Sequence, residues 1–130
     1  MALSRTVPIA ILILSCIFPA DCVDTTVVNK ICNGNKYSDW SLYSFSVARV
    51  FSDLADKTAK SGCDYYSKFD NSGHVCYGHA ACNGTLSQSD CSYCVRTAWD
   101  DVDDQCDHSI GVQFQLHDCR LRYENYPFTE

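Results

Sequence analysis

Glycine and proline are scarce in this sequence of 130 residues, at 6 and 3 respectively, and methionine occurs once. This scarcity excludes collagen-like and low-complexity chains, which are rich in glycine and proline. Positive charge is scarce too, because 10 lysines and arginines stand against 16 aspartates and glutamates, for a net charge of −6. The acidic balance argues against a nucleic-acid partner, which is held through neutralised phosphates, and against membrane disruption by a cationic face.

A hydrophobic run long enough to cross a membrane is also missing. The longest apolar stretch, residues 7–19, is shorter than the ~20 residues that a transmembrane helix needs. It follows Arg5 and ends in small residues that suit a cleavage site, which is typical of a secretory signal peptide. We therefore predict a signal peptide at residues 1–22, a mature chain that begins at Val23, and a secreted protein without a transmembrane anchor.

Cysteine, in contrast, is abundant, with 10 in the chain. An even number remains after the signal peptide, which in an exported protein indicates a disulfide framework, although the count leaves the pairing open. A zinc site that combines the motif Cys91-Ser-Tyr-Cys94 with Cys82 and His79 is the alternative, but export favours oxidation and no second C-x2-C motif completes the site. The eight cysteines of the predicted mature chain are Cys32, Cys63, Cys76, Cys82, Cys91, Cys94, Cys106 and Cys119.

The hydrophobic pattern predicts a first helix between residue 38 and Gly62. Apolar side chains recur there at spacings of three and four, which places them on one face of a helix. Ser38 or Asp39 can cap its first turn, and Gly62 can adopt the left-handed conformation that ends a helix. The expected buried stripe consists of Trp40, Tyr43, Val47, Val50, Phe51, Leu54 and Thr58.

A second helix is predicted to begin near Ser87 or Ser89. Its periodic positions place Cys91 and Cys94 one turn apart on the side that faces the core. The two cysteines can therefore reach different partners instead of each other. The expected stripe is Cys91, Cys94, Val95, Ala98 and Val102.

Two hairpins complete the expected elements. Residues 63–66 and 75–82 flank the turn signal Asp70-Asn-Ser-Gly73, and Gly78 is interpreted as marking a bulge. Further along, the sequence alternates between apolar and polar residues on both sides of a turn, which predicts two strands.

The second hairpin, residues 110–124, also predicts which polar side chains are neighbours. A two-residue turn at residues 117–118 places Gln113 opposite Arg122, and alternation places Glu124 on the same polar face. No linker or internal repeat divides the chain. The sequence therefore predicts one α+β domain.

The cysteine spacing resembles that of a known family. The segment from Cys82 to Cys94 has the spacing C-x8-C-x2-C, and the residues around the later cysteines agree as well. Over essentially all of residues 23–130, the chain resembles the ginkbilobin-type cysteine-rich secretory domain of seed plants. The motifs are Cys82-Asn-Gly-Thr-Leu-Ser-Gln-Ser-Asp-Cys91-Ser-Tyr-Cys94, Cys106-Asp-His-Ser-Ile-Gly, Leu116-His-Asp-Cys119-Arg-Leu-Arg-Tyr-Glu124, and the pair Cys32-Asn33.

The resemblance implies a five-stranded antiparallel sheet packed with two helices. Cys63 and Cys76 lie outside its three-bridge pattern; because the predicted hairpin puts them on facing strands, we expect them to pair with each other. Each bridge contributes on the order of 2–4 kcal/mol by restricting the unfolded chain. The implied disulfides are Cys32–Cys106, Cys82–Cys91 and Cys94–Cys119.

The resemblance also implies a mannose site. In the family prototype the sugar is held by an Asn after the first cysteine, an Arg in the penultimate strand and a Glu in the last strand. Asn33 and Glu124 correspond to the first and third, whereas Gln113 stands where the prototype has Arg and so lacks its charge and five-donor fork. We hypothesise that Arg122, expected beside Gln113, partly replaces that guanidinium. A turn role for Asn33 and an ion pair for Glu124 are the alternatives.

Other chemistry finds little support in the sequence. No G-x-S-x-G motif surrounds a serine, and full pairing of the cysteines would leave no thiol nucleophile, so no enzyme is expected. The acidic residues within 100–107 lack the spacing of a calcium loop and are interpreted as a solvated surface, so no metal or cofactor is expected. Asn83-Gly-Thr85 is a candidate N-glycosylation site.

These features lead us to expect a secreted plant defence protein with antifungal activity. It would act as a mannose-binding lectin on mannan-type glycans of the fungal surface, through binding without turnover. In the relatives that carry two copies of the domain, both copies precede a membrane span. This sequence shows one copy and no predicted span. The alternative is a protein-interaction module of the same fold that has lost sugar binding, which the departure at Gln113 favours.

Overall fold

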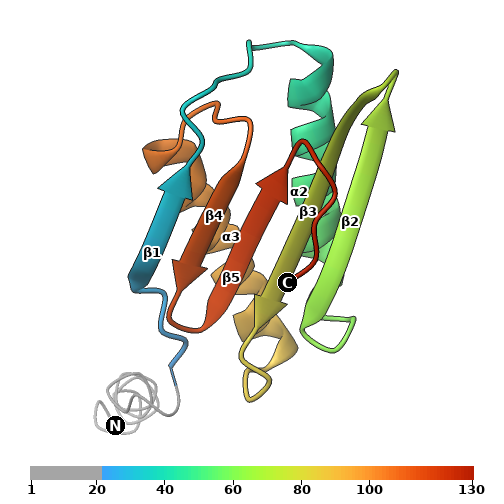
Figure 1. The fold of residues 1–130 in the computed structure, drawn as a ribbon. Coiled ribbons are helices and arrows are strands. Elements are labelled where there is room, and N and C mark those ends of the chain that lie inside the picture. The colour runs from blue at the N-terminus through green and yellow to red at the C-terminus, as the bar shows by residue number, and fades with distance from the viewer. Residues whose placement is uncertain (1–21) are drawn as a thin grey trace, which may run out of the picture.

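The computed structural model describes residues 22–130. A five-stranded antiparallel sheet has the order β1-β4-β5-β3-β2, and two helices cover one of its faces (Figure 1). This is the single α+β domain that the sequence predicts. The predicted signal peptide lies outside the described residues, apart from Cys22. The elements are β1 (Val27–Cys32), α2 (Leu42–Lys57), β2 (Asp64–Asn71), β3 (His74–Cys82), α3 (Gln88–Gln105), β4 (Val112–Leu116) and β5 (Cys119–Glu124).

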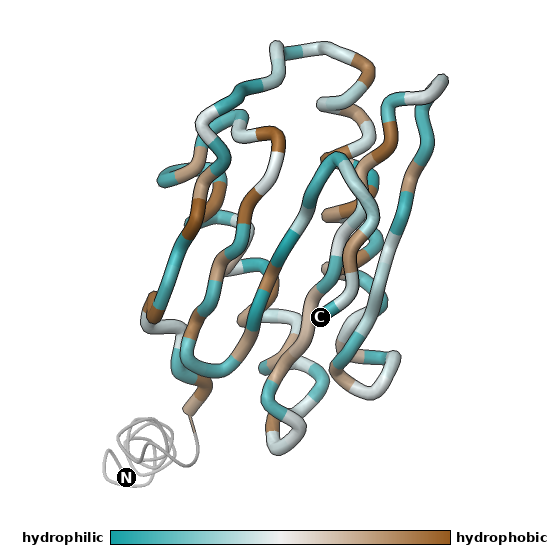
Figure 2. The backbone as a smooth tube through the Cα atoms, in the orientation of Figure 1, coloured by the Kyte–Doolittle hydropathy of each residue, from teal (hydrophilic) through white to brown (hydrophobic). Residues whose placement is uncertain are grey.

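The hydrophobic core fills the space between the sheet and the two helices. Strands β4 and β5 alternate between hydrophobic and hydrophilic residues, as predicted (Figure 2). Their apolar side chains, Phe114 and Leu121 among them, are buried against the helices. Phe51 of α2 stacks on Trp99 of α3 with ring centroids 4.2 Å apart, which joins the two helices. None of the helices in residues 22–130 has the length and apolarity that crossing a membrane requires.

The helices agree with the predicted stripes in part: in α2, Tyr43 and Phe51 are only partly buried, and the start of the helix differs. Helix α3 begins at the N-cap Ser87 and buries all five predicted side chains. Helix α2 begins after the N-cap Ser41, because the Ser41 hydroxyl accepts a hydrogen bond from the backbone N–H of Ser44. Trp40 lies before this cap with a positive φ of 61° and is 84% exposed, so its assignment to the buried stripe is wrong.

Strands β2 and β3 form the predicted hairpin, with Ser72 and Gly73 in the turn. Both have positive φ, 52° and 87°, as a type I′ turn requires. The interpretation of Gly78 as a bulge is wrong, since it pairs in register with Ser67. A Cβ at Gly78 would lie 2.4 Å from Cγ1 of Val50, so glycine is needed there because α2 packs directly on β3.

Three disulfides join the two layers and the edge strand. They tie β1 to the end of α3, the end of β3 to the start of α3, and α3 to the start of β5. All three agree with the pairing that the family resemblance implies. They are Cys32–Cys106, Cys82–Cys91 and Cys94–Cys119.

The predicted Cys63–Cys76 disulfide is wrong, because both residues are thiols. The carbonyl of Cys63 accepts a hydrogen bond from the N–H of Cys82, whereas Cys76 pairs with Phe69. Phe69 follows Cys63 by six positions, which at ~3.3 Å per residue separates the two cysteines by roughly 20 Å along the hairpin. That distance is beyond the reach of a disulfide. The full pairing of cysteines, which excluded a thiol nucleophile, therefore does not hold.

The two thiols should differ sharply in reactivity. Cys76 is fully buried, and burial raises the pKa of its thiol to about 12, whereas Cys63 is partly exposed. Since the thiolate is the reactive species, iodoacetamide at pH 8 should alkylate Cys63 in the folded protein and Cys76 only after denaturation. Mass spectrometry of proteolytic peptides measures both. Equal labelling of the two thiols in the native state would contradict the fold at β3.

Candidate functional site

The face of the sheet opposite the helices, here called the outer face, carries a row of polar side chains across the strands. Gln113 of β4 pairs with Arg122 of β5, and Arg122 pairs in turn with His79 of β3. The row continues to Ile31 on β1 and to Tyr66 on β2. Side chains at paired positions of antiparallel strands point to the same face and contact their neighbours. The predicted pairing of Gln113 with Arg122 is confirmed.

The structure brings the three predicted sugar-binding residues together. Asn33 follows β1, Gln113 lies in β4 and Glu124 ends β5, and these three strand regions meet at one end of the sheet (Figure 1). All three residues line one shallow, open depression of about 150 Å³. The remaining lining residues are Ile31, Gly111, Val112 and Tyr126.

Asn33 is held at the rim of the depression by its backbone. Its N–H donates to the carbonyl of Gly111 at 2.9 Å, which extends the pairing of β1 beyond the strand. Its side-chain Oδ1 accepts from the N–H of Asn35 at 2.9 Å, so the turn role is present. The side-chain Nδ2 donates to no protein group within residues 22–130, and Asn33 is partly exposed. One donor therefore remains for a ligand.

Glu124 lies on the outer face as predicted, but its carboxylate is only 7% exposed. Oε2 accepts a hydrogen bond from Arg122 Nε at 2.9 Å, so the ion pair named as the alternative is formed. A Cβ at Gly111 would lie 2.2 Å from Oε1, so the carboxylate rests directly over this glycine. Oε1 accepts no hydrogen bond within the described part of the chain.

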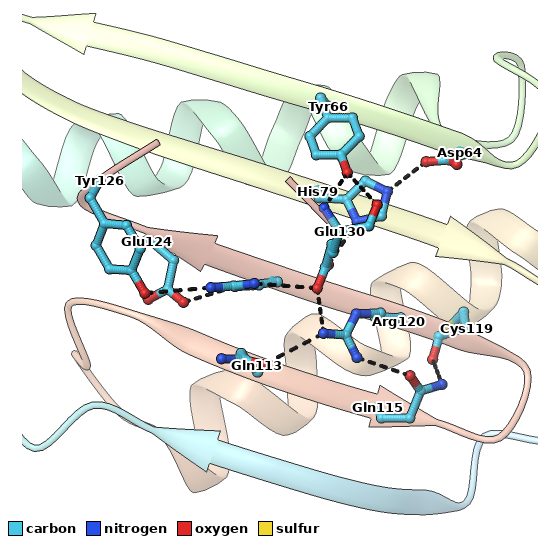
Figure 3. A network of polar contacts seen from close by, with 11 residues as sticks. Asp64, Tyr66, His79, Gln113, Gln115, Cys119, Arg120, Glu124, Tyr126 and Glu130 are labelled. Atoms are coloured by element: carbon cyan, nitrogen blue, oxygen red, sulfur yellow. Dashed lines mark hydrogen bonds and ion pairs between the residues drawn. The ribbon is translucent and has the colours of Figure 1, made fainter. Parts of the chain in front are cut away.

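Gln113 is the third residue of the depression and is partly buried. Its Oε1 accepts from Arg120 Nη2 at 3.5 Å, and Arg120 also donates to Gln115 Oε1 at 3.3 Å (Figure 3). The acceptor of the Gln113 amide thus faces a protein donor. Its Nε2 is the group that a ligand hydroxyl can use.

Arg122 does not line the depression, although it stands beside Gln113. Its Nε donates to Glu124, its Nη1 to Glu130 at 3.4 Å and its Nη2 to the hydroxyl of Tyr126 at 3.4 Å (Figure 3). The guanidinium is therefore committed to protein groups on three sides. It positions Glu124, and whether it also replaces the family arginine stays a prediction.

Residues 125–130 turn back over the outer face after β5 (Figure 1). The carboxylate of Glu130 meets three basic side chains, here called the cradle: His79, Arg120 and Arg122. Its Oε1 lies 2.8 Å from His79 Nδ1, and its Oε2 accepts from Arg120 Nη2 and, at 3.4 Å, from Arg122 Nη1. Figure 3 shows His79 and Arg120 pointing toward Glu130 from β3 and β5.

The imidazole of His79 is enclosed on all sides. Its Nε2 lies 2.5 Å from Asp64 Oδ1, and Tyr66 stacks on it with ring centroids 4.1 Å apart. The His79 side chain is 5% exposed. Both ring nitrogens thus lie within hydrogen-bonding distance of a carboxylate oxygen. The ring is therefore held in one orientation, with Nδ1 toward Glu130.

The cradle changes the acidity of Glu130. Burial raises the pKa of this carboxyl, but hydrogen bonds from Arg120 and His79, together with their charges, outweigh burial and lower it to about 2. The ionised form of Glu130 is the one that the cradle holds.

Neither the cradle nor the four other residues that line the depression were predicted from the sequence. His79 lies in the predicted strand 75–82, but nothing local indicates that β3 lies beside β5. Gly111 and Tyr126 were missed for the same reason, because their importance depends on the position of Glu124 and Arg122.

Asn83 lies in the exposed loop between β3 and α3, which the Cys82–Cys91 disulfide closes. Its Oδ1 accepts hydrogen bonds from the N–H and the hydroxyl of Thr85, at 3.2 and 3.0 Å. The loop is at the opposite end of the sheet from the end of β5 (Figure 1). A glycan on Asn83 would leave the depression uncovered.

The zinc alternative is excluded, because Cys91 and Cys94 are both in disulfides. Within residues 22–130 no cluster of three or more His, Cys, Asp or Glu side chains is arranged to hold a metal ion. Asp103 and Asp104 of the acidic stretch are exposed at the end of α3.

Comparison with known proteins shows which proteins this chain resembles in sequence and fold. Residues 31–126 match the family described as salt stress response/antifungal. The chain is 33% identical over 110 residues to the antifungal protein ginkbilobin-2 of Ginkgo biloba, covering 83% of this chain and 82% of the relative. It is 34% identical over 107 residues to the antifungal protein ginkbilobin-like protein 1 of Picea glauca, covering 81% and 76%. Among solved structures, the tandem DUF26 ectodomain of the Arabidopsis thaliana cysteine-rich receptor-like protein PDLP5 superimposes with a TM-score of 0.73 at 25% identity, covering 79% of this chain and 51% of that ectodomain.

Docking of residues 125–130 should depend on pH through Glu130. Its pKa is lowered from 4.5 to about 2, so the stabilisation is present above pH 4.5 and is lost as the pH falls toward 2. We expect the ¹³C carboxyl resonance of Glu130 to titrate near 2, with the Tyr66 ring resonances changing over the same range. In Glu130→Gln the Tyr66 resonances should show no such transition. Titration of the Glu130 carboxyl near 4.5 would show that the cradle does not hold it.

Proposed function

The chain belongs to the salt stress response/antifungal family, and on this premise we propose that it is a secreted plant defence protein with antifungal activity. We further propose that it binds mannose-bearing glycans of the fungal surface. The observation that carries this proposal is the meeting of Asn33, Gln113 and Glu124, from three separate strand regions, in one open depression. Binding without turnover is sufficient for such a role.

The groups left available in the depression suit vicinal sugar hydroxyls. Asn33 Nδ2 and Gln113 Nε2 can donate, and Glu124 Oε1 can accept, so neighbouring hydroxyls find both kinds of partner. Tyr126 is 48% exposed at the edge of the depression and offers its ring to the C–H face of a sugar. The Arg122–Glu124 ion pair keeps the acceptor in place before a ligand arrives.

A single site of this kind should bind weakly. The depression is shallow, and Gln113 supplies neither the charge nor the fork of an arginine. Useful affinity then depends on repeated mannose units or on more than one copy of the protein. Mannan-type glycans meet the first condition.

The proposal predicts an NMR titration with methyl α-mannoside. The sugar should shift the amide resonances of Asn33, Gln113 and Glu124 with a dissociation constant in the millimolar range. The variant Asn33→Ala should show no such shifts. Gln113→Arg should strengthen binding by about 10-fold, because a charged hydrogen bond replaces a neutral one. Gln88→Arg, the same change at an exposed position on α3, is the matched control and should leave affinity unchanged.

A spectrum that stays unchanged at high millimolar sugar, in both the wild-type protein and Gln113→Arg, would contradict the lectin proposal. Antifungal assays of Asn33→Ala then separate the two functions. If growth inhibition survives the loss of sugar binding, the protein acts through another surface of the same fold.

The second candidate function is a protein-interaction module that has lost sugar binding. Two observations favour it: the Gln113 acceptor is turned toward Arg120, and the guanidinium of Arg122 is committed elsewhere. The similar PDLP5 ectodomain contains the domain in tandem within a receptor-like protein.

A further inference from the structure

We propose that the outer face is also a peptide-recognition site, which takes an extended segment carrying an aromatic residue followed two positions later by a glutamate. In this structure the chain's own residues Phe128 and Glu130 occupy it. The proposal goes beyond sugar binding and does not depend on it, since it uses the β3–β5 part of the face and not the depression.

The glutamate position is a built site for one carboxylate. His79, Arg120 and Arg122 converge on the two oxygens of Glu130, and the side chains of His79 and Arg122 are 5% and 13% exposed. The His79 ring is held by Asp64, which contacts its Nε2, and by Tyr66, which stacks on the face of the ring. Asp64 orients His79 and Glu124 orients Arg122 independently of Glu130, and donors oriented in advance bind an anion with little further ordering.

The aromatic position lies beside it. The guanidinium of Arg122 lies over the ring of Phe128, 4.1 Å from its centroid, and the Tyr66 ring is 6.4 Å from it. A partly buried arginine stacked on an aromatic ring is a favourable contact that lysine reproduces poorly. Phe128 thus contacts the flat face of the Arg122 guanidinium, while Glu130 contacts the nitrogen atoms of all three cradle side chains.

Recognition of the segment's backbone comes from one side chain, Tyr66. Its hydroxyl donates to the carbonyl of Glu130 at 2.9 Å and accepts from the N–H of Glu130 at 2.8 Å. Any peptide can present these two groups. The contacts that require particular side chains are therefore those to Phe128 and Glu130.

The charges at the site call for a single anionic side chain. Without Glu130, Arg122 keeps Glu124 as its partner and His79 keeps Asp64. Arg120 would then have no carboxylate partner within the described residues. One incoming carboxylate restores the balance, whereas a polyanion would meet a chain of net charge −6.

The segment that occupies the site is not needed by the core. None of residues 125–130 belongs to the buried hydrophobic cluster, and Pro127 and Thr129 are exposed. Sheet, helices and disulfides are complete at Glu124. A segment tethered so closely has an effective concentration of the order of millimolar, so a partner must bind more tightly than the chain's own residues to displace them.

The test adds residues 125–130 as a separate peptide to a protein in which the same segment can no longer occupy the site. The probe is the acetylated and amidated peptide Asn-Tyr-Pro-Phe-Thr-Glu, and the receptor is the full protein carrying Phe128→Ala and Glu130→Gln. NMR titration should show shifts at Tyr66, His79 and Arg120. The wild-type protein, and a probe with glutamine in place of glutamate, should each bind at least about 10-fold more weakly.

Two receptor variants that each remove one positive charge distinguish binding in the cradle from general electrostatic attraction of the acidic peptide. Arg120→Gln, added to the disabled receptor, should abolish binding of the peptide. Arg96→Gln removes the same charge from an exposed position on α3 and should leave binding unchanged. The core resonances of Phe114 and Leu121 report whether each variant is folded, and Glu130→Gln alone replaces the double variant if they change.

Three outcomes would overturn the proposal: no binding to the disabled receptor, equal binding of the glutamate and glutamine probes, or equal loss in Arg120→Gln and Arg96→Gln. Sodium glucuronate is titrated alongside. If it binds the disabled receptor as tightly as the peptide, the cradle recognises acidic sugars and peptide recognition is wrong. The mannoside titration uses proteins whose cradle is unchanged, so its result does not depend on these variants.

Discussion

The outer face depends on the register that places Arg122 between Gln113 and His79. A shift of one residue in β5 would turn Arg122 and Glu124 together from the outer face into the core. In the observed register its guanidinium donates to Glu124 on one side and to Glu130 on the other. The open depression and the covered cradle are thus two ends of one hydrogen-bonded row.

The disulfides explain why this register is secure. Cys94–Cys119 ties the first residue of β5 to α3, and Cys82–Cys91 ties the end of β3 to the same helix. Both strands that carry the cradle are therefore anchored to one rigid element on the opposite face. Side chains of the outer face can then vary, as at Gln113, without disturbing the scaffold. This separation of scaffold and site is consistent with a family in which similar folds serve antifungal proteins and receptor-like ectodomains.

Much of this architecture could be predicted from sequence where the signal was local. Alternation along 110–124 predicted the last hairpin and the pairing of Gln113 with Arg122, and helical periodicity predicted the core stripe of α3. Strand β1 was not recognised from its residues, because Val27–Cys32 lacks alternation and is exposed throughout at the sheet edge. Cys63 and Cys76 were paired wrongly because facing strands were considered without their register. The cradle could not be predicted, since it requires the adjacency of β3 and β5 and the return of residues 125–130, which are long-range features.

Arg122 holds the depression and the cradle at once, and the variant Arg122→Lys tests this role. Lysine keeps the positive charge but cannot donate in three fixed directions or stack as a planar group. A ¹H–¹⁵N spectrum of this variant should show large shifts at Gly111 and Glu124 together with shifts at Tyr66, His79 and Glu130, while the core resonances stay in place. Shifts confined to one of these two groups would contradict the claim, because the depression and the cradle would then be independent.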